Sequence, residues 1–346
     1  MIINKQKVPW KGFHDGILIL YIGRLVENKN QDFRVQTPKL FGSQIIVGFV
    51  VLFVSGSKMD LTPEYSPIYH KIPYFDYTLP EYVKIGKVSL LLGENIDFKF
   101  KRACVAEFLA MLFFVLLCCG CAMVTLALPN PNLMMVAASF GFGIMCLAQF
   151  VGPLSGGHIN CAVSWALFVA GRVSFVRCAC YTFSQMGGSI LGAFFLWAIF
   201  GDHWPAARAF GSNSWDESTF TGGQVFFAEM LGTMLLVYCV FATIDIPSDG
   251  GGALGVYPIA MSVMVAHLFL LPIDGCSINP TRSFGPSLVA AIAGISGNYY
   301  HQQYMFWFGP LIGATLAAII YGMYVRLYLF MSAWIYDGII YFAIYE

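Results

Sequence analysis

The chain alternates between long apolar stretches and short polar segments, and six of the stretches are long enough to cross a bilayer. They fall at residues 103–128, 133–152, 176–200, 224–244, 253–271 and 304–325. A spanning helix needs about 20 apolar residues, and in lipid a helix satisfies its own backbone hydrogen bonds. These stretches are too apolar for the amphipathic helices of a water-soluble protein. The pattern therefore predicts an all-α membrane protein with six transmembrane helices.

Two further segments, residues 155–169 and 274–290, are moderately apolar and too short to span a membrane. Each begins with a glycine-rich turn. Irregular backbone at membrane depth is tolerated only where protein or water surrounds it. We therefore expect two re-entrant half-helices that enter the membrane without crossing it.

The two halves of the chain repeat each other. AEFL at residues 106–109 corresponds to AEML at 228–231, and Ile-Asn at 159–160 corresponds to Ile-Asn at 278–279. Each half holds three spans and one re-entrant segment. An odd number of spans turns the second copy upside down, which predicts an inverted repeat around a site near the bilayer midplane.

Composition supports a membrane protein and excludes several functional classes. Hydrophobic residues make up 58% of the chain and charged residues 11%, against about 25% charged in soluble domains. The 19 Lys and Arg balance the 19 Asp and Glu, so no global field would attract nucleic acid. Fourteen of those 19 basic residues precede the first span. The positive-inside rule therefore places both termini in the cytoplasm.

The same pattern divides the chain into three parts. Residues 1–100 form an N-terminal cytoplasmic region of unknown order, because their two apolar runs are too short to span. Residues 101–326 form the membrane domain, with repeats at about 103–200 and 222–325. Residues 327–346 form an apolar, aromatic tail.

No arrangement of residues in the sequence indicates catalysis, a metal or a cofactor. There is no phosphate-binding glycine loop, no His and Cys set with metal spacing, and no Ser-His-Asp arrangement beyond chance. Most of the ten cysteines lie inside apolar runs, where cysteine behaves as a small core residue. The sequence predicts neither an enzyme nor a bound cofactor.

Two segments carry a family resemblance. SGGHINCAVS, starting at residue 155, and DGCSINPTRSFGPS, starting at residue 274, resemble the two signature loops of the major intrinsic proteins, the aquaporins. The resemblance covers residues 101–326. It implies six transmembrane helices plus two re-entrant half-helices, one pore per subunit and a homotetramer in membrane lipid.

The asparagines of these segments explain how such a pore would work. If Asn160 and Asn279 cap two half-helices that meet at the midplane, their amide groups donate hydrogen bonds to a passing water. The two positive helix ends also repel cations. The motifs read Asn160-Cys161-Ala162 and Asn279-Pro280-Thr281. Both depart from the family's Asn-Pro-Ala, which leaves the midplane geometry open.

The resemblance also assigns a selectivity filter and two structural acids. The four filter positions are Phe140, His267, Cys276 and Arg282. They match the narrow, water-selective version of the filter, in which the arginine opposes protons and cations. An acid inside a membrane is costly without partners, and the family places Glu107 and Glu229 as braces of the re-entrant loops.

We therefore interpret the chain as a passive channel that conducts water in single file, in the plasma membrane by base rate. Two alternatives stay open. The permeant could be another small neutral solute, such as glycerol, peroxide or ammonia. The chain could also be a low-flux scaffold or adhesion protein on the aquaporin fold, as the variant motifs and the unmatched N-terminal region allow.

Overall fold

The structure, a computed structural model, describes most of the chain beyond residue 92. The described residues are 17–20, 25–27, 33–35, 50–53, 93–201, 206–245, 252–295, 297 and 299–345. The predicted N-terminal region thus lies largely outside them. The chain divides into two compact units, one made of Met1–Ile72 with Arg326–Glu346 and the other of Pro73–Val325.

The first unit holds two small antiparallel sheets. Strand β1 (Ile17–Leu20) pairs with β4 (Val50–Phe53), and β2 (Leu25–Glu27) pairs with β3 (Phe33–Val35). Strands β1 and β4 come from the two apolar runs that are too short to span a membrane. β-Branched and aromatic residues in these runs favour extended backbone.

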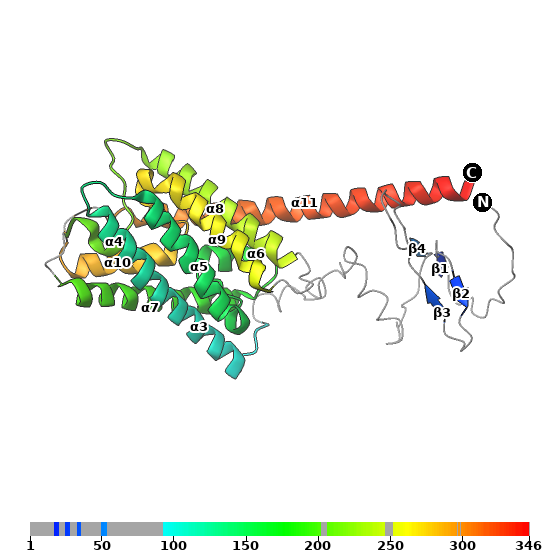
Figure 1. The fold of residues 1–346 in the computed structure, drawn as a ribbon, viewed down its shortest axis with the longest axis horizontal. Coiled ribbons are helices and arrows are strands. Elements are labelled where there is room, and N and C mark those ends of the chain that lie inside the picture. Colours follow the sequence, from blue (N-terminus) through cyan, green and yellow to red (C-terminus); the bar gives the residue numbers. More distant parts are fainter. Residues whose placement is uncertain are drawn as a thin grey trace. The chain divides into compact units, whose positions relative to one another are not determined.

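The second unit is a helical bundle with the six predicted spans (Figure 1). The first span joins α3 (Phe98–Phe114), a π-helical turn η3 (Val115–Cys119) and α4 (Gly120–Leu126). The other spans are α5 (Leu133–Ser155), α7 (Phe175–Phe200), α8 (Gly222–Asp245), α9 (Gly252–Asp274) and α11 (Gln303–Tyr345). Helix α11 continues past the predicted end of the sixth span, through most of the predicted tail. The prediction of six spanning helices is confirmed.

Two short helices occupy the predicted re-entrant positions. Helix α6 (Cys161–Val169) lies between α5 and α7, and α10 (Pro280–Ile292) lies between α9 and α11. With 9 and 13 residues, and a rise of about 1.5 Å per residue, neither can cross a bilayer. A short 3₁₀ helix, η5 (Ala206–Gly211), lies in the loop before α8.

Polar side chains fix where the helices begin. Asp97 accepts a hydrogen bond from the Phe100 N–H at the start of α3 (2.8 Å), and Asn132 accepts one from the Met135 N–H at the start of α5 (3.2 Å). Ser174 does the same for α7. Each satisfies a backbone donor that the helix leaves without an internal partner.

Small residues allow the helices to pack backbone against backbone. A Cβ on Gly188 of α7 would overlap the Phe108 carbonyl oxygen of α3, and a Cβ on Gly285 of α10 would overlap Ser189 of α7. Membrane helices associate largely through such close approach, because lipid supplies no hydrophobic driving force between them. Helix α7 therefore links the first span to the second half-helix.

Two ion pairs tie loop residues to helix ends. Arg172, in the loop after α6, makes a bidentate pair with Asp245 at the end of α8, at 2.6 and 2.8 Å. Arg177 of α7 pairs with Glu94. The bidentate geometry suits a guanidinium facing a carboxylate and explains Asp245, for which the sequence alone suggests no role.

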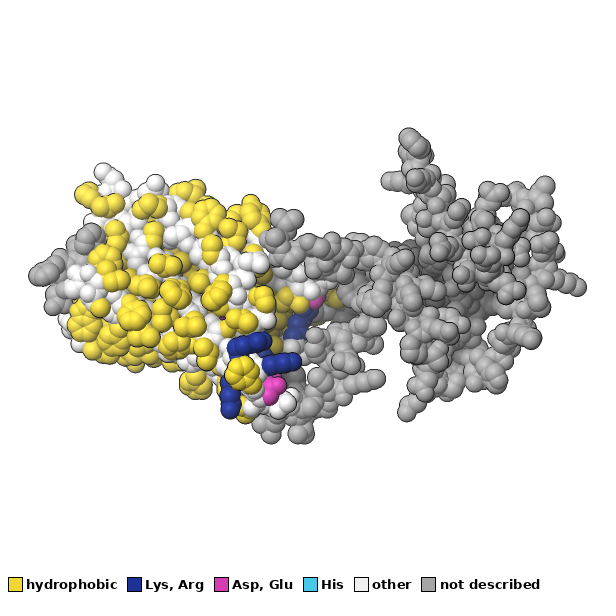
Figure 2. Space-filling view, turned by 60° about the horizontal axis from the view of Figure 1, so that its bottom comes forward, with side chains coloured by type: hydrophobic (Ala, Val, Ile, Leu, Met, Phe, Trp, Pro, Cys, Tyr) yellow, Lys and Arg dark blue, Asp and Glu magenta, His cyan; other side chains and the backbone are white. Residues whose placement is uncertain are grey.

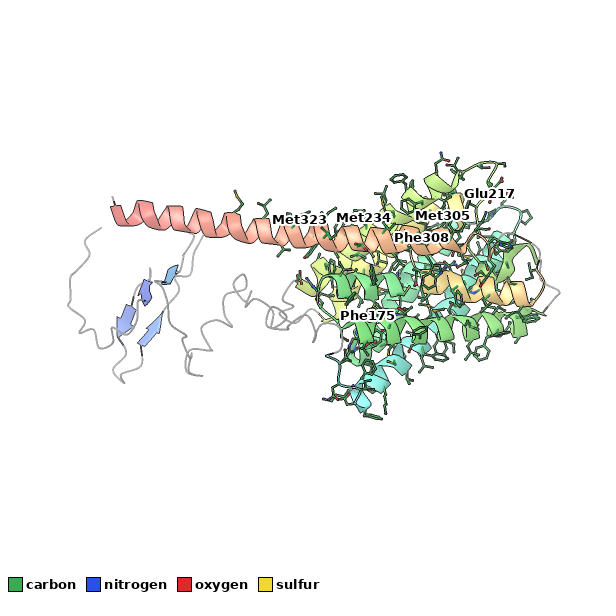
Figure 3. The ribbon with its side chains drawn as sticks, turned by 180° about the vertical axis from the view of Figure 1, so that it is seen from behind. Phe175, Glu217, Met234, Met305, Phe308 and Met323 are labelled. Carbon is green, nitrogen blue, oxygen red and sulfur yellow. The ribbon has the colours of Figure 1, made fainter. Side chains whose placement is uncertain are left out.

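The outer surface of the bundle is apolar. Figure 2 shows hydrophobic side chains over its visible flank, with Lys and Arg gathered at one end. Exposed aromatic residues include Phe142, Phe183 and Phe227. Figure 3 shows Phe175, at the start of α7, and Glu217, before α8, towards opposite ends of the bundle. Such a surface is compatible with lipid around the flank and water at the ends.

Replacing Gly188 by alanine should destabilise the bundle, because the new methyl group meets the α3 backbone rather than a mobile side chain. We expect a loss of about 2–3 kcal/mol in the free energy of unfolding. The thermal midpoint in detergent should then fall by roughly 5–10 °C. Gly152→Ala is the matched control, since a Cβ there has no atom within 4 Å. Equal midpoints for the two variants would contradict this packing.

Candidate functional site

The two predicted asparagines meet across the centre of the bundle. Asn160 caps α6 and Asn279 caps α10. The side-chain amide of Asn160 donates to the Ile278 carbonyl (2.7 Å), and that of Asn279 donates to the Ile159 carbonyl (2.8 Å). Each bond joins one half-helix to the loop that leads into the other. The reciprocal pair follows the inverted repeat that the sequence predicts.

Each loop is held by one buried glutamate. Glu107 of α3 accepts from the backbone N–H of His158 (2.9 Å) and Ile159 (2.7 Å). Glu229 of α8 accepts from the backbone N–H of Ser277 and Ile278, both at 2.6 Å. Both glutamates are fully buried, where a backbone N–H without a partner would be costly.

The glutamates also stabilise a strained backbone. Ile159 has a φ of +48° and Ile278 a φ of +44°, values that a β-branched residue rarely adopts. Such strain persists only where surrounding contacts fix it. The carboxylates supply these contacts, so each loop turns sharply and starts its half-helix at the asparagine.

The variant residues of the two motifs lie at the same meeting point. Cys161 and Pro280 are the first residues of α6 and α10. Pro280 has the preset φ and the missing N–H that suit this position. Cys161, Ala162 and Thr281 are buried.

The four predicted filter residues come from three elements and the loop before α10. Phe140 lies in α5, His267 in α9 and Arg282 in α10. The rings of Phe140 and His267 stack, with centroids 4.1 Å apart, and the Arg282 guanidinium carbon lies 5.0 Å from the Phe140 ring centroid. Cys276 precedes α10 with a φ of +55°. None of the four is more than 1% exposed, so all four are enclosed by the protein.

Arg282 is fixed by the loop before α8. Its Nη1 donates to the Gly211 carbonyl at 2.9 Å and to Oδ1 of Asn213. Asn213 is buried and also accepts from the Ser283 hydroxyl at 2.7 Å. Within the described residues, no carboxylate forms an ion pair with Arg282. The hydrogen-bond acceptors of its guanidinium are therefore neutral oxygens.

Two buried nitrogen atoms of the predicted filter residues are Nε2 of His267 and Nε of Arg282. Neither has a hydrogen-bond partner among the described residues. Nδ1 of His267 contacts the Val263 carbonyl at 2.8 Å. A carbonyl only accepts, so Nδ1 carries the proton and Nε2 of the neutral ring is an acceptor. Buried polar groups almost always have partners. The acceptor Nε2 of His267 and the donor Nε of Arg282 would suit a small neutral molecule that can both donate and accept a hydrogen bond.

The loop before α8 also contains a hydrogen-bonded turn at Asp216. Asp216 accepts from the backbone N–H of Ser218 (2.9 Å) and from the hydroxyls of Ser218 and Thr219. These hydrogen bonds lower the pKa of the Asp216 carboxyl from its usual value. These contacts order the turn just before α8.

Three residues that the sequence analysis did not single out take part in this site: Ser155, Gln185 and Asn213. Ser155 and Gln185 both donate to Glu107, at 2.6 and 2.8 Å. A lone amide in the apolar stretch 176–200 was the available signal for Gln185, since polar groups inside membranes are costly without a role. No local pattern identifies Asn213 before the loop is folded.

Comparison with known proteins places the chain in a family. The profile described as Major intrinsic protein matches residues 94–321, which is about two-thirds of the chain. This stretch contains both half-helices, both glutamates and all four filter positions.

Individual relatives agree with this match. The chain is 36% identical to aquaporin-5 of Ovis aries over 224 residues, covering 64% of this chain and 80% of the relative. It is 37% identical to aquaporin-5 of Homo sapiens over 227 residues, with the same coverage. With aquaporin-2 of Rattus norvegicus the identity is 38% over 229 residues, covering 64% and 78%.

The fold also matches a solved structure, the X-ray structure of the aquaglyceroporin from Plasmodium falciparum. The TM-score is 0.58 at 18% identity, and the match covers 64% of this chain and 95% of that one. At this identity the match concerns the fold alone. Together, the profile and the relatives show that the chain belongs to the major intrinsic protein family, the aquaporins, and is a multi-pass membrane channel rather than an enzyme.

Proposed function

We propose that this channel conducts water passively, in single file, along osmotic gradients. The observation that carries the proposal is the buried cluster of Phe140, His267 and Arg282, with one unpartnered acceptor and one unpartnered donor among its nitrogens. Water can donate a hydrogen bond to the acceptor and accept one from the donor. The relatives named aquaporin-5 and aquaporin-2 support the same permeant.

The midplane supports selectivity against ions. Asn160 and Asn279 each use one amide hydrogen for the opposite loop, and a carboxamide carries two. The second hydrogen can donate to water. The positive ends of α6 and α10 face the same region, so a cation or a proton relay is disfavoured there.

We further propose the topology and assembly. Residues 101–326 form the channel domain and residues 1–100 a cytoplasmic region, with both termini in the cytoplasm. Exposed basic residues at the start of α3 (Lys99, Lys101 and Arg102) support this orientation through the positive-inside rule. We infer a homotetramer in the plasma membrane from family resemblance and base rate.

Osmotic swelling of oocytes that express the chain tests the permeant. We expect fast swelling without glycerol uptake, because Phe140 and His267 match the narrow version of the filter. Surface labelling is the control for expression. Swelling together with glycerol uptake would favour a channel that also passes larger neutral solutes. Protein at the surface without swelling would favour the low-flux scaffold.

Widening the filter should change selectivity. The double variant Phe140→Ala, His267→Gly removes both stacked rings, so we expect it to admit glycerol while still passing water. Uptake of labelled glycerol by oocytes measures the effect. Phe142→Ala is the matched control, because Phe142 lies on the same helix with half of its surface exposed. Continued exclusion of glycerol by the double variant would move the constriction elsewhere.

A mercurial reagent should block the channel through Cys276. Its thiol belongs to the proposed filter, so a bound mercury atom would fill the narrow passage. We expect external mercurial to stop swelling in the original chain and to leave Cys276→Ser conducting. Cys146→Ser controls for the exposed cysteine on α5. A full block of Cys276→Ser would point to another thiol, with Cys161 as the first candidate.

A further inference from the structure

Thr281 stands where the family motif has alanine, and its hydroxyl is part of a polar contact at the midplane. The Thr281 hydroxyl lies 2.8 Å from Oδ1 of Asn279 and 3.3 Å from Oε1 of Gln185. Thr281 and Gln185 are both fully buried. In such surroundings a hydrogen bond is strong and an unmade one is costly.

The direction of these bonds can be worked out from chemistry. Glu107 accepts from Ser155, His158, Ile159 and Gln185, so the amide nitrogen of Gln185 must face Glu107. Its Oε1 then faces Thr281. A hydroxyl has one proton, and the closer acceptor is Asn279 Oδ1, with Gln185 Oε1 as the second. The one proton is therefore shared in a three-centre hydrogen bond, mainly with Asn279 Oδ1 and more weakly with Gln185 Oε1.

The result is a continuous chain of hydrogen bonds from one repeat to the other. It runs from Asn279 through Thr281 and Gln185 to Glu107, which holds the loop of the first motif. Asn279 Oδ1 accepts a second bond from the Arg282 backbone N–H at 3.2 Å. The oxygen of the Asn279 carboxamide is thus fixed from two sides.

The first motif lacks this reinforcement. Asn160 Oδ1 accepts one hydrogen bond among the described residues, from the Ala162 N–H at 2.8 Å. Ala162 occupies the position that corresponds to Thr281 and has no hydroxyl.

We propose that Thr281 is a positioning residue that fixes the Asn279 carboxamide and joins the second half-helix to the Glu107 brace of the first. With its oxygen held, Asn279 keeps one amide hydrogen on the Ile159 carbonyl and the other directed away from it. This inference rests on the proposed water channel, in which that second hydrogen meets the permeant.

Two substitutions separate the hydroxyl from the methyl group. Thr281→Val keeps the shape and removes the hydroxyl, so we expect water permeability per surface channel to fall about fivefold, as one lost hydrogen bond would predict. Thr281→Ser keeps the hydroxyl and should stay within about twofold of the original chain. Both variants lose some stability, so stability alone would lower the permeability of both. A difference in permeability between them therefore reports the effect of the hydroxyl on the position of Asn279.

The matched control is Thr233→Val. Thr233 is a fully buried threonine of α8 whose hydroxyl donates to the Glu229 carbonyl of its own helix at 2.8 Å. The substitution is chemically identical but leaves the motif network intact, so permeability should not change. Unchanged permeability of Thr281→Val, or an equal loss in Thr281→Ser, would overturn the proposal.

A second measurement distinguishes a failure of the proposed water permeation from a failure of the Thr281 hydrogen-bond network. If the original chain conducts no water, the proposed permeant is wrong, and the network is tested by thermal unfolding in detergent. Thr281→Val leaves Gln185 Oε1 buried without a donor, so its midpoint should lie about 3 °C below that of Thr233→Val. Equal midpoints would overturn the network itself.

Discussion

The structure depends on one constraint: two chain segments stop inside a membrane, where every backbone N–H must find a partner within the protein. Glu107 and Glu229 solve this problem by accepting the N–H groups of the two turns. Because the glutamate oxygens accept hydrogen bonds from these N–H groups, the turns can hold Ile159 and Ile278 at positive φ. The asparagines that follow then start α6 and α10 facing each other. Without the two buried acids, neither half-helix would have a fixed starting point.

The proposed filter depends on this arrangement. The start of α10 fixes the backbone of Arg282, and the loop before α8 then holds its guanidinium through Gly211 and Asn213. Phe140 and His267 come from spans that pack against each other, α5 and α9. The ring contact between them therefore depends on helix packing, whereas the charge depends on a half-helix and a loop. This division explains how one site can combine a steric limit with an electrostatic one.

The sequence predicted the parts that have a strong local signal. Spans of about 20 apolar residues, asparagines before short helices, and paired glutamates one repeat apart are visible without a structure. Gln185 and Asn213 were not predicted, since their importance comes from residues 78 and 69 positions away. The π-helical turn in the first span and the strands β1 to β4 were also missed. Their apolar residues suit several conformations, and packing or pairing decides among them.

We propose that the buried filter residues and the paired asparagines form a passage for water that excludes protons. Purified protein in lipid vesicles tests it directly, with osmotic shrinkage and proton flux measured on the same preparation. We predict shrinkage much faster than in protein-free vesicles, with a lower activation energy and an unchanged proton flux. Shrinkage no faster than in protein-free vesicles would contradict water conduction, and a raised proton flux would contradict the barrier assigned to Arg282 and the two half-helices.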